Sequence, residues 1–208
     1  MTTTASVLPF DAVLCDLDGV IRFFDHGEVE RLARAAGLAD GAVWGAAFGG
    51  ELGQRLVLGE VDRPQWVAQI AGRLGEVMAA PAAEELARAF AYSPARADAE
   101  AVALLRRARA HVPVLLVTNA TVWLEEDLAA LGLTDLADQV VNSARVGHAK
   151  PDQRIYRLAA ERAGTTPDRC LFVDDRAENT EAAAALGMRT ALHRSPADLA
   201  AALAPLWA

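Results

Sequence analysis

The chain has 208 residues, 53% of them apolar and 23% charged, so it is long enough for one compact core that carries a smaller insert. Its 20 basic and 28 acidic side chains give a net charge of −8, which argues against a sequence-independent grip on nucleic acid or on an anionic membrane. Because no apolar run reaches the roughly 18 residues of a membrane span, and residues 1–10 lack the basic flank and apolar stretch of a secretion signal, we expect a cytoplasmic protein.

The spacing of apolar residues in the N-terminal half changes once, from a strand pattern to a helical pattern. A short apolar strand is predicted over residues 12–15, and it runs directly into the carboxylate-rich turn Asp16-Leu17-Asp18-Gly19. From about residue 25 to residue 90, apolar side chains recur at helical spacing and glycines break the pattern, which predicts an all-helical stretch. The stretches on either side, residues 21–25 and 91–96, are predicted to be linkers.

Helices and apolar strands alternate in the C-terminal half. The predicted helices cover residues 97–110, 123–131, 154–163 and 179–186, and the predicted strands cover residues 112–117, 139–142 and 170–173, of which the last is the final strand. Repeated strand–helix units with continuous apolar strands predict a parallel sheet covered by helices on both faces. We therefore expect an α/β fold with a doubly wound, Rossmann-like core (residues 1–22 and 95–208) and an inserted small helical cap domain (residues 23–94).

Polar side chains follow three of the predicted strands. They are Asp16 and Asp18, Thr118 and Asn119, and Asp174 and Asp175. Because ligands of open α/β sheets bind outside the carboxyl ends of the strands, we expect these groups to share one crevice. Four carboxylates in one crevice repel one another and need a cation, and ligands that are all oxygen atoms favour Mg²⁺.

Two residue types are rare in the chain. The 20 basic residues are 19 arginines and a single lysine, Lys150, which lies in a loop after another predicted strand. An ammonium group is a compact charge that fits where the planar guanidinium does not, so we expect Lys150 to be a functional residue of the same crevice. The two cysteines, Cys15 and Cys170, lie in apolar runs and are expected to be buried thiols without a disulfide.

This set of groups suits attack on a phosphate ester. A carboxylate whose repulsion from phosphate is removed by a hard cation can attack phosphorus and form an aspartyl phosphate, and Asp16 is the candidate nucleophile. Asp18, crowded by other carboxylates, is expected to hold a proton, deliver it to the leaving oxygen and later activate water. Thr118 and Asn119 can donate hydrogen bonds to the phosphoryl oxygens, and Lys150 offsets negative charge.

Four motifs occur in the order seen in the haloacid dehalogenase-like (HAD) hydrolase superfamily, which the chain resembles over nearly its whole length. They are Asp16-Leu17-Asp18-Gly19-Val20, Thr118-Asn119, Lys150-Pro151 and Asp174-Asp175. The resemblance implies that Asp16 is the nucleophile and Asp18 the general acid and base. It also implies that Mg²⁺ is held by Asp16, the backbone carbonyl of Asp18, and Asp175, with Asp174 as a further ligand or a holder of metal-bound water. The helical insert is similar in its position to the family's C1-type cap, which closes over the substrate.

Three features favour the phosphatase branch of that family. True dehalogenases of the family usually lack the second aspartate, because a halide needs no protonation, and Asp18 is present here. The family's phosphonate hydrolases use a lysine of the cap, and residues 23–94 contain none. The run from Asp174 to Asn179 resembles that of sugar-phosphate phosphatases, so a sugar phosphate is a candidate among small phosphorylated metabolites. Asn179 is expected either to orient the loop or Lys150, or to cap its helix.

Two other functions remain open at this point. A sugar phosphomutase would use the same aspartyl phosphate and return the phosphoryl group to a sugar if the cap excluded water. A phospho-receiver signalling module also combines paired acids, a threonine and a lysine around a phosphorylated aspartate, but its acidic pair comes first and it has no helical insert. We expect a monomer or a homodimer.

Residues outside the motifs receive less specific predictions. Arg22 and His26 are candidates to contact a leaving group, but a solvated linker is the favoured interpretation. Trp44, Phe48 and Arg55 are candidates to line a pocket, but aromatic residues of a small helical cap more often form its core. The acidic run over residues 125–127 is expected on a solvated helix face.

Overall fold

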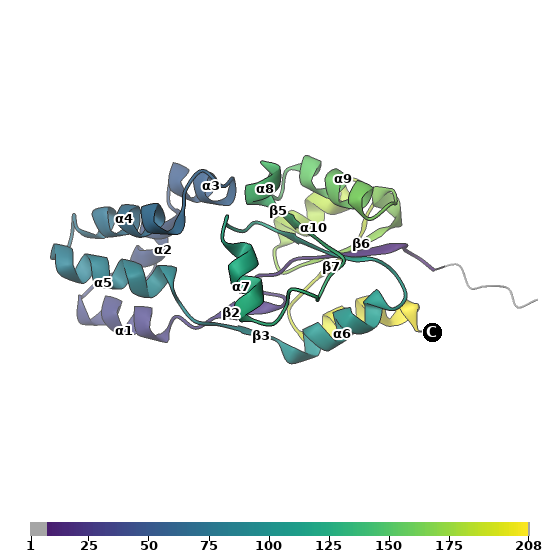
Figure 1. Cartoon of the computed structure of the whole chain (residues 1–208), viewed down its shortest axis with the longest axis horizontal. Coiled ribbons are helices and arrows are strands. Elements are labelled where there is room, and N and C mark those ends of the chain that lie inside the picture. The colour runs from purple at the N-terminus through teal and green to yellow at the C-terminus, as the bar shows by residue number, and fades with distance from the viewer. Residues whose placement is uncertain (1–7, 208) are drawn as a thin grey trace, which may run out of the picture.

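The computed structural model describes residues 8–207 and is drawn in Figure 1. The expectation about a secretion signal in residues 1–10 falls mostly outside the described part of the chain. No helix within residues 8–207 combines the length and the apolar character that a membrane crossing requires.

A five-stranded parallel sheet forms the centre of the larger part of the molecule. Its strands are β1 (Ala12–Cys15), β4 (Val114–Thr118), β5 (Gln139–Asn142), β6 (Cys170–Asp174) and β7 (Arg189–Leu192). They lie in the order β5-β4-β1-β6-β7, and all neighbours are parallel. The sheet grows toward β5 on one side of β1 and toward β7 on the other, so the strand order reverses at β1. Open α/β sheets bind ligands at such a reversal.

Helices cover both faces of this sheet, as its continuous apolar strands require. One face packs against α6 (Ala99–Arg109), α7 (Leu124–Ala130) and α11 (Pro196–Leu203), and the other against α9 (Gln153–Arg162) and α10 (Ala177–Ala184). In β1, Val13 and Cys15 belong to the first apolar cluster, while Ala12 and Leu14 belong to the second, which is the two-residue alternation of a strand. The predicted doubly wound α/β core is confirmed, and both cysteines are buried and free.

The five helices between residues 24 and 95 of the sequence lie together at one end of the molecule (Figure 1). They are α1 (Gly27–Ala35), α2 (Ala42–Phe48), α3 (Glu51–Val57), α4 (Arg63–Leu74) and α5 (Ala80–Ala91). α4 begins at a capping box in which Asp62 and Gln65 bond each other's backbone, and it buries Trp66 and Ile70. These helices share an apolar cluster that is separate from the two clusters of the sheet. We refer to them as the cap helices.

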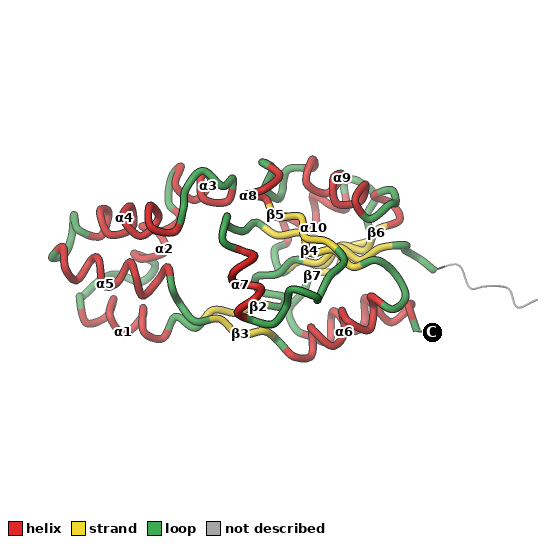
Figure 2. The backbone as a smooth tube through the Cα atoms, in the orientation of Figure 1, coloured by secondary structure: helices red, strands yellow, loops and turns green. Residues whose placement is uncertain are grey.

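The two stretches predicted to be linkers contain short strands, which we did not predict. β2 (Arg22–Phe24) and β3 (Ala95–Ala97) pair antiparallel and form a short two-stranded ribbon between the cap helices and the main sheet (Figure 2). Three-residue strands are too short to show an alternating pattern, and Pro94 and two arginines obscure the apolar signal. β2 leads into the cap helices and β3 leads out of them, and the ribbon joins these two segments by backbone hydrogen bonds.

The strand over residues 170–173 is not the last one. β7 adds an edge strand, and α11 follows it. β7 has the sequence Arg-Thr-Ala-Leu and is mostly exposed, so it lacks the apolar run of the central strands. The remaining short elements of the described chain are α8 (Ser143–Val146) and the 3₁₀ turns η1 (Pro167–Arg169) and η2 (Ala204–Leu206).

Candidate active site

Side chains from three strand ends and one loop meet at the carboxyl edge of the sheet. Asp16 follows β1, Thr118 ends β4 and Asp174 ends β6, while Lys150 lies in the loop between α8 and α9. Carboxylate oxygens of Asp16, Asp174 and Asp175 lie within 4.8 Å of one another. Asp16 and Asp175 are more than 150 residues apart in the sequence, and the fold brings them together.

Asp16 is a buried carboxylate held in one orientation. Its Oδ1 accepts a hydrogen bond from the backbone N–H of Leu17 at 2.7 Å and lies 2.7 Å from Lys150 Nζ. Burial raises the pKa of Asp16 to about 7, with a further contribution from the Asp174 charge and against the opposing effect of Lys150. Burial therefore disfavours the charged form of Asp16 more than Lys150 favours it.

Lys150 connects two of the carboxylates. Its Nζ lies 2.7 Å from Asp16 Oδ1 and donates to Asp174 Oδ2 at 2.6 Å. Burial lowers the pKa of Lys150, but the attraction of Asp16 and Asp174 outweighs burial, so this pKa lies above its ordinary value. At neutral pH the ammonium group is charged.

Asn119 holds the loop that carries Lys150. Its Nδ2 donates to the Lys150 carbonyl at 2.8 Å, and its Oδ1 accepts from the Lys150 backbone N–H at 2.7 Å. We expected the Asn119 amide to donate to phosphoryl oxygens, but the structure engages its oxygen and one N–H with the backbone of Lys150. Its clearest contribution is thus to position the lysine.

Asp174 has partners on both carboxylate oxygens. Oδ2 accepts from Lys150, and Oδ1 accepts from the Arg176 backbone N–H and from Asn179 Nδ2, both at 2.9 Å. Asn179, in the first turn of α10, therefore orients Asp174, which differs from the two roles that we expected for it. Because the oxygens of Asp174 are occupied in this way, Asp16 and Asp175 are the carboxylates best placed to bind a metal directly.

Thr118 offers a hydroxyl to the crevice. Its Oγ1 is buried and has no hydrogen-bond partner among the described residues. A buried hydroxyl without a partner is costly, so this atom suits an acceptor oxygen of a bound ligand. Thr118 lines the same cavity as Asp16 and Lys150, a cavity of about 370 Å³ that we call the acid cavity.

Gly19 allows Asp175 to approach the turn after β1. The backbone of Gly19 has φ +83°, and a Cβ atom on it would lie 2.3 Å from Asp175 Oδ2. Only glycine combines this left-handed conformation with so close a contact. Burial and the Asp174 charge raise the pKa of Asp175.

The surroundings of Asp18 differ from our expectation. Arg22 Nε donates to Asp18 Oδ1 at 2.5 Å, and Nη2 donates to Asp18 Oδ2 at 2.9 Å, so the nearest partner is a guanidinium group and not another carboxylate. Arg22 is buried rather than solvated. A carboxyl group that delivers a proton from this position has to turn away from Arg22.

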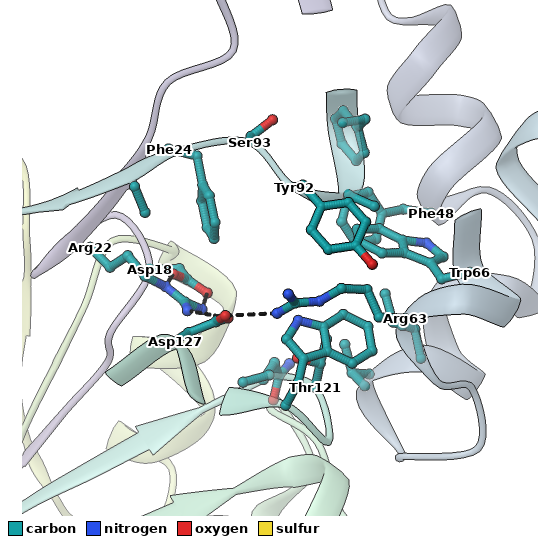
Figure 3. A pocket seen from close by; sticks show the side chains of 18 of the residues that line it. Asp18, Arg22, Phe24, Phe48, Arg63, Trp66, Tyr92, Ser93, Thr121 and Asp127 are labelled. Carbon is teal, nitrogen blue, oxygen red and sulfur yellow. Dashed lines mark hydrogen bonds and ion pairs between the residues drawn. The ribbon is translucent and has the colours of Figure 1, made fainter. Parts of the chain in front are cut away.

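A chain of ion pairs extends from Asp18 into the cap helices (Figure 3). Arg22 Nη1 donates to Asp127 Oδ2 at 3.0 Å, and Arg63 Nη2 donates to Asp127 Oδ1 at 2.7 Å. Asp127 belongs to α7 and Arg63 to α4, so the solvated helix face expected for residues 125–127 is wrong at Asp127. The position of α7 directly after a strand that carries site residues indicates that an acidic residue of its first turn can reach the ligand-binding edge, but it does not indicate which one.

A second cavity, of about 340 Å³, adjoins the acid cavity, and we call it the aromatic cavity. Its walls come from the cap helices, the β2–β3 ribbon and the segment around α7. Trp44 and Phe48 line it and are substantially exposed, so they do not form the cap core as we expected. Arg55 pairs with Glu60 on the surface instead. Asp18 and Arg22 line both cavities.

The acidic groups fit a magnesium ion. The carboxylates of Asp16, Asp174 and Asp175 face the one ammonium group of Lys150, which leaves an excess of two negative charges. That excess matches a divalent cation, and after burial the Asp174 charge also raises the pKa values of Asp16 and Asp175. All the donors are oxygen atoms, the ligands that Mg²⁺ prefers.

Comparison with known proteins gives consistent results. The family model for haloacid dehalogenase-like hydrolases matches residues 10–187. Phosphatase MT3486 of Mycobacterium tuberculosis is 31% identical over 192 residues, which cover 89% of this chain and 88% of that protein. The pyrimidine 5'-nucleotidase YjjG of Escherichia coli is 40% identical over 82 residues, or 38% of this chain and 36% of that protein. A HAD family enzyme from Bacteroides thetaiotaomicron, solved in complex with magnesium and inorganic phosphate, has a TM-score of 0.67 at 19% identity and covers 87% of this chain and 92% of its own.

Proposed function

The chain belongs to the haloacid dehalogenase-like hydrolase family, and from this premise we propose that it is a Mg²⁺-dependent phosphatase that hydrolyses a small phosphorylated metabolite through an aspartyl phosphate on Asp16. The observation that carries the proposal is the charge arrangement at the sheet edge, where Asp16, Asp174 and Asp175 surround a single Lys150. The similarity to a mycobacterial phosphatase over most of both chains supports it.

Two carboxylates carry the covalent steps in this proposal. Asp16 attacks phosphorus, the ester P–O bond breaks, and the leaving oxygen takes a proton from Asp18. Asp18 then accepts a proton from water as that water attacks the phosphorus, the bond between phosphorus and Asp16 breaks, and inorganic phosphate leaves. Asp18 turns away from Arg22 for the proton transfers.

The other groups of the acid cavity bind and orient the phosphoryl group. Asp16, Asp175 and the backbone carbonyl of Asp18 would hold Mg²⁺, which when bound reduces the repulsion between the phosphate and the carboxylates. The buried Thr118 Oγ1 donates to a phosphoryl oxygen, and Lys150 balances negative charge beside Asp16. Asn119 and Asp174 keep Lys150 in place.

Release of inorganic phosphate tests this proposal. Purified protein is incubated with a panel of phosphate monoesters, including p-nitrophenyl phosphate and a sugar monophosphate, with Mg²⁺ or with EDTA. We expect phosphate release with Mg²⁺ and none with EDTA. Isomerisation of the sugar phosphate with almost no phosphate released would instead indicate a phosphomutase, and a phosphoryl adduct that persists without turnover would indicate a receiver module.

Gly19→Ala is expected to weaken the metal site. The variant forces a left-handed backbone onto alanine and pushes Asp175 away, so we expect a loss of about 1–3 kcal/mol in the free energy of unfolding and a higher Mg²⁺ concentration for half-maximal activity. Gly164→Ala is the matched control, because Gly164 has φ +74° with no atom within 4 Å of its Cβ position. If both variants need the same Mg²⁺ concentration, the contact with Asp175 has no role in metal binding.

A further inference from the structure

The aromatic cavity lies beside the acid cavity, where the alcohol part of a bound phosphate ester has to go. Six residues line both cavities: Asp18, Arg22, Phe24, His26, Trp44 and Asn119. Figure 3 shows that Phe48, Trp66 and Tyr92 of the aromatic cavity face the same interior as the Asp18–Arg22–Asp127 ion pairs. A leaving group attached to a phosphate in the acid cavity therefore meets these rings.

Four of the aromatic side chains in this wall are exposed to solvent. The exposed fractions are 41% for Phe24, 51% for Trp44, 37% for Phe48 and 54% for Tyr92. They are the exposed large aromatic residues of the described chain, and all of them line this one cavity. Exposed aromatic surface is costly in water, and its concentration in one concave site is typical of a binding site for an apolar group.

The rings form a connected wall and are not scattered. Trp44 stacks on Phe48 with 5.3 Å between ring centroids, and it meets Phe90 edge-on at 5.2 Å. Phe48 also contacts Trp66 at 5.6 Å. Phe90 and Trp66 are buried, so they support the exposed rings from behind and keep the shape of the cavity.

Several polar groups of the cavity are already engaged with protein partners. Trp66 Nε1 donates to the Ala47 carbonyl at 2.9 Å, and His26 Nδ1 lies 3.0 Å from Ser93 Oγ, which itself donates to the Ala89 carbonyl. Groups that are bonded to the protein in this way are less available to replace the hydrogen bonds that sugar hydroxyls lose on leaving water, which disfavours a sugar relative to an apolar group.

Arg63 lies between two rings of the cavity wall. Its guanidinium carbon lies 5.1 Å from the Tyr92 ring centroid and 4.9 Å from that of Trp123, so both rings cover the guanidinium group. Its Nε is buried and has no hydrogen-bond partner among residues 8–207. The two rings therefore cover this guanidinium group, and the wall of the cavity is mostly apolar at this point.

We propose that the substrate is a phosphate monoester of an apolar alcohol, whose hydrocarbon part binds among Trp44, Phe48 and Phe90. This inference rests on the proposed phosphatase function, and it replaces the sugar phosphate as the favoured substrate class. On hydrolysis the alcohol leaves into the aromatic cavity with the proton from Asp18, and water supplies the hydroxyl group of inorganic phosphate.

Four esters of primary alcohols test the proposal, because their leaving groups have similar intrinsic reactivity. They are 2-(1-naphthyl)ethyl phosphate, decyl phosphate, glucose 6-phosphate and ethyl phosphate, each assayed with Mg²⁺ by release of inorganic phosphate. We expect kcat/KM to be at least about tenfold higher for one of the two apolar esters than for glucose 6-phosphate. The naphthyl and decyl arms distinguish a ring-bearing alcohol from an open chain, and a preference for either supports the proposal.

Three variants test whether the aromatic cavity causes the preference for an apolar ester. Trp44→Ala and Phe48→Ala truncate exposed side chains, so the fold should survive, which a thermal unfolding curve checks. Each variant should reduce the ratio of kcat/KM for the preferred apolar ester to that for ethyl phosphate by about tenfold. Val77→Ala is the control, because Val77 is exposed among the cap helices but lies outside the aromatic cavity, and its ratio should equal that of the unaltered protein.

The outcomes separate the two proposals. Turnover of glucose 6-phosphate that equals or exceeds that of both apolar esters overturns the inference and leaves the phosphatase function standing. An unchanged ratio in Trp44→Ala and Phe48→Ala also overturns the inference alone. Absence of phosphate release from all four esters overturns the phosphatase function and the inference with it.

Discussion

Asp16→Asn is expected to reduce Mg²⁺-dependent phosphate release by roughly a thousandfold or more, while the protein remains folded. The amide is nearly isosteric with the carboxylate, but it is not a nucleophile toward phosphorus. Residual activity above a few per cent of that of the unaltered protein would show that another group attacks.

The same variant makes a prediction about stability. Burial raises the pKa of Asp16 to about 7, so the folded protein retains a proton on this group in a range where the unfolded chain, with a pKa near 3.8, has lost it. The folded state then binds more protons than the unfolded state, and the free energy of unfolding falls as the pH rises from about 4 to about 7. Asp16→Asn removes this contribution, because an amide does not titrate.

Denaturant unfolding in EDTA at pH 5 and pH 8 measures the effect. The stability of Asp16→Asn relative to the unaltered protein should be higher at pH 8 than at pH 5. Asp135→Asn is the control, since Asp135 has a side chain that is 73% exposed and pairs only with Arg106 at the surface. A relative stability of Asp16→Asn that does not change with pH would contradict the raised pKa that burial gives Asp16.

The positions of the site residues could be predicted from the sequence because strand ends are easy to recognise. Buried parallel strands appear as continuous apolar runs, and a carboxylate or hydroxyl group directly after such a run has to lie at the carboxyl edge of the sheet. Asp16, Thr118 and Asp174 are found by this rule. Lys150 follows from composition instead, as the one lysine among 20 basic residues.

The partners of these residues could not be predicted, because they depend on which helix lies over the site. Nothing in the local sequence distinguishes Asp127 from its two acidic neighbours, and only the placement of α7 directs it toward Arg22 and Arg63. Arg22 lies in a strand too short to be recognised. The pairing of Arg22 with Asp18 depends on the tight turn in which Gly19 N–H donates to the Arg22 carbonyl.

A pocket lined by Trp44 and Phe48 is a candidate from the sequence, but the cap core is the favoured interpretation, for a different reason. Trp44 and Phe48 occur at helical spacing among apolar residues, a pattern that predicts a buried face. Five short helices can bury only part of their apolar surface against one another, and the structure turns these two rings toward the core domain instead. Periodicity identifies the face of a helix, but it does not show whether a second element covers that face.

Lys150→Met is expected to destabilise the protein by about 3–5 kcal/mol in EDTA, because it leaves Asp16 and Asp174 buried without the ammonium group between them. The pKa of Lys150 is raised in the folded protein. Its contribution to the free energy of unfolding is therefore present throughout the neutral pH range and is lost only as the pH rises through that folded-state pKa. Denaturant unfolding at pH 7.5 measures the loss. Mg²⁺ should restore part of it, because a bound cation stabilises the folded state alone.

The double variant Lys150→Met with Asp174→Asn distinguishes lost charge from lost packing. If the loss comes from the unpaired Asp174 carboxylate, the second change should recover about 1–3 kcal/mol, as is found when both members of a buried pair are replaced. If methionine simply packs badly beside Phe172, the second change should recover nothing. We expect no phosphate release from the single or the double variant, because neither has a positive charge beside Asp16 and the transferring phosphoryl group. Recovery of stability without recovery of activity would show that Lys150 serves the reaction as well as the fold.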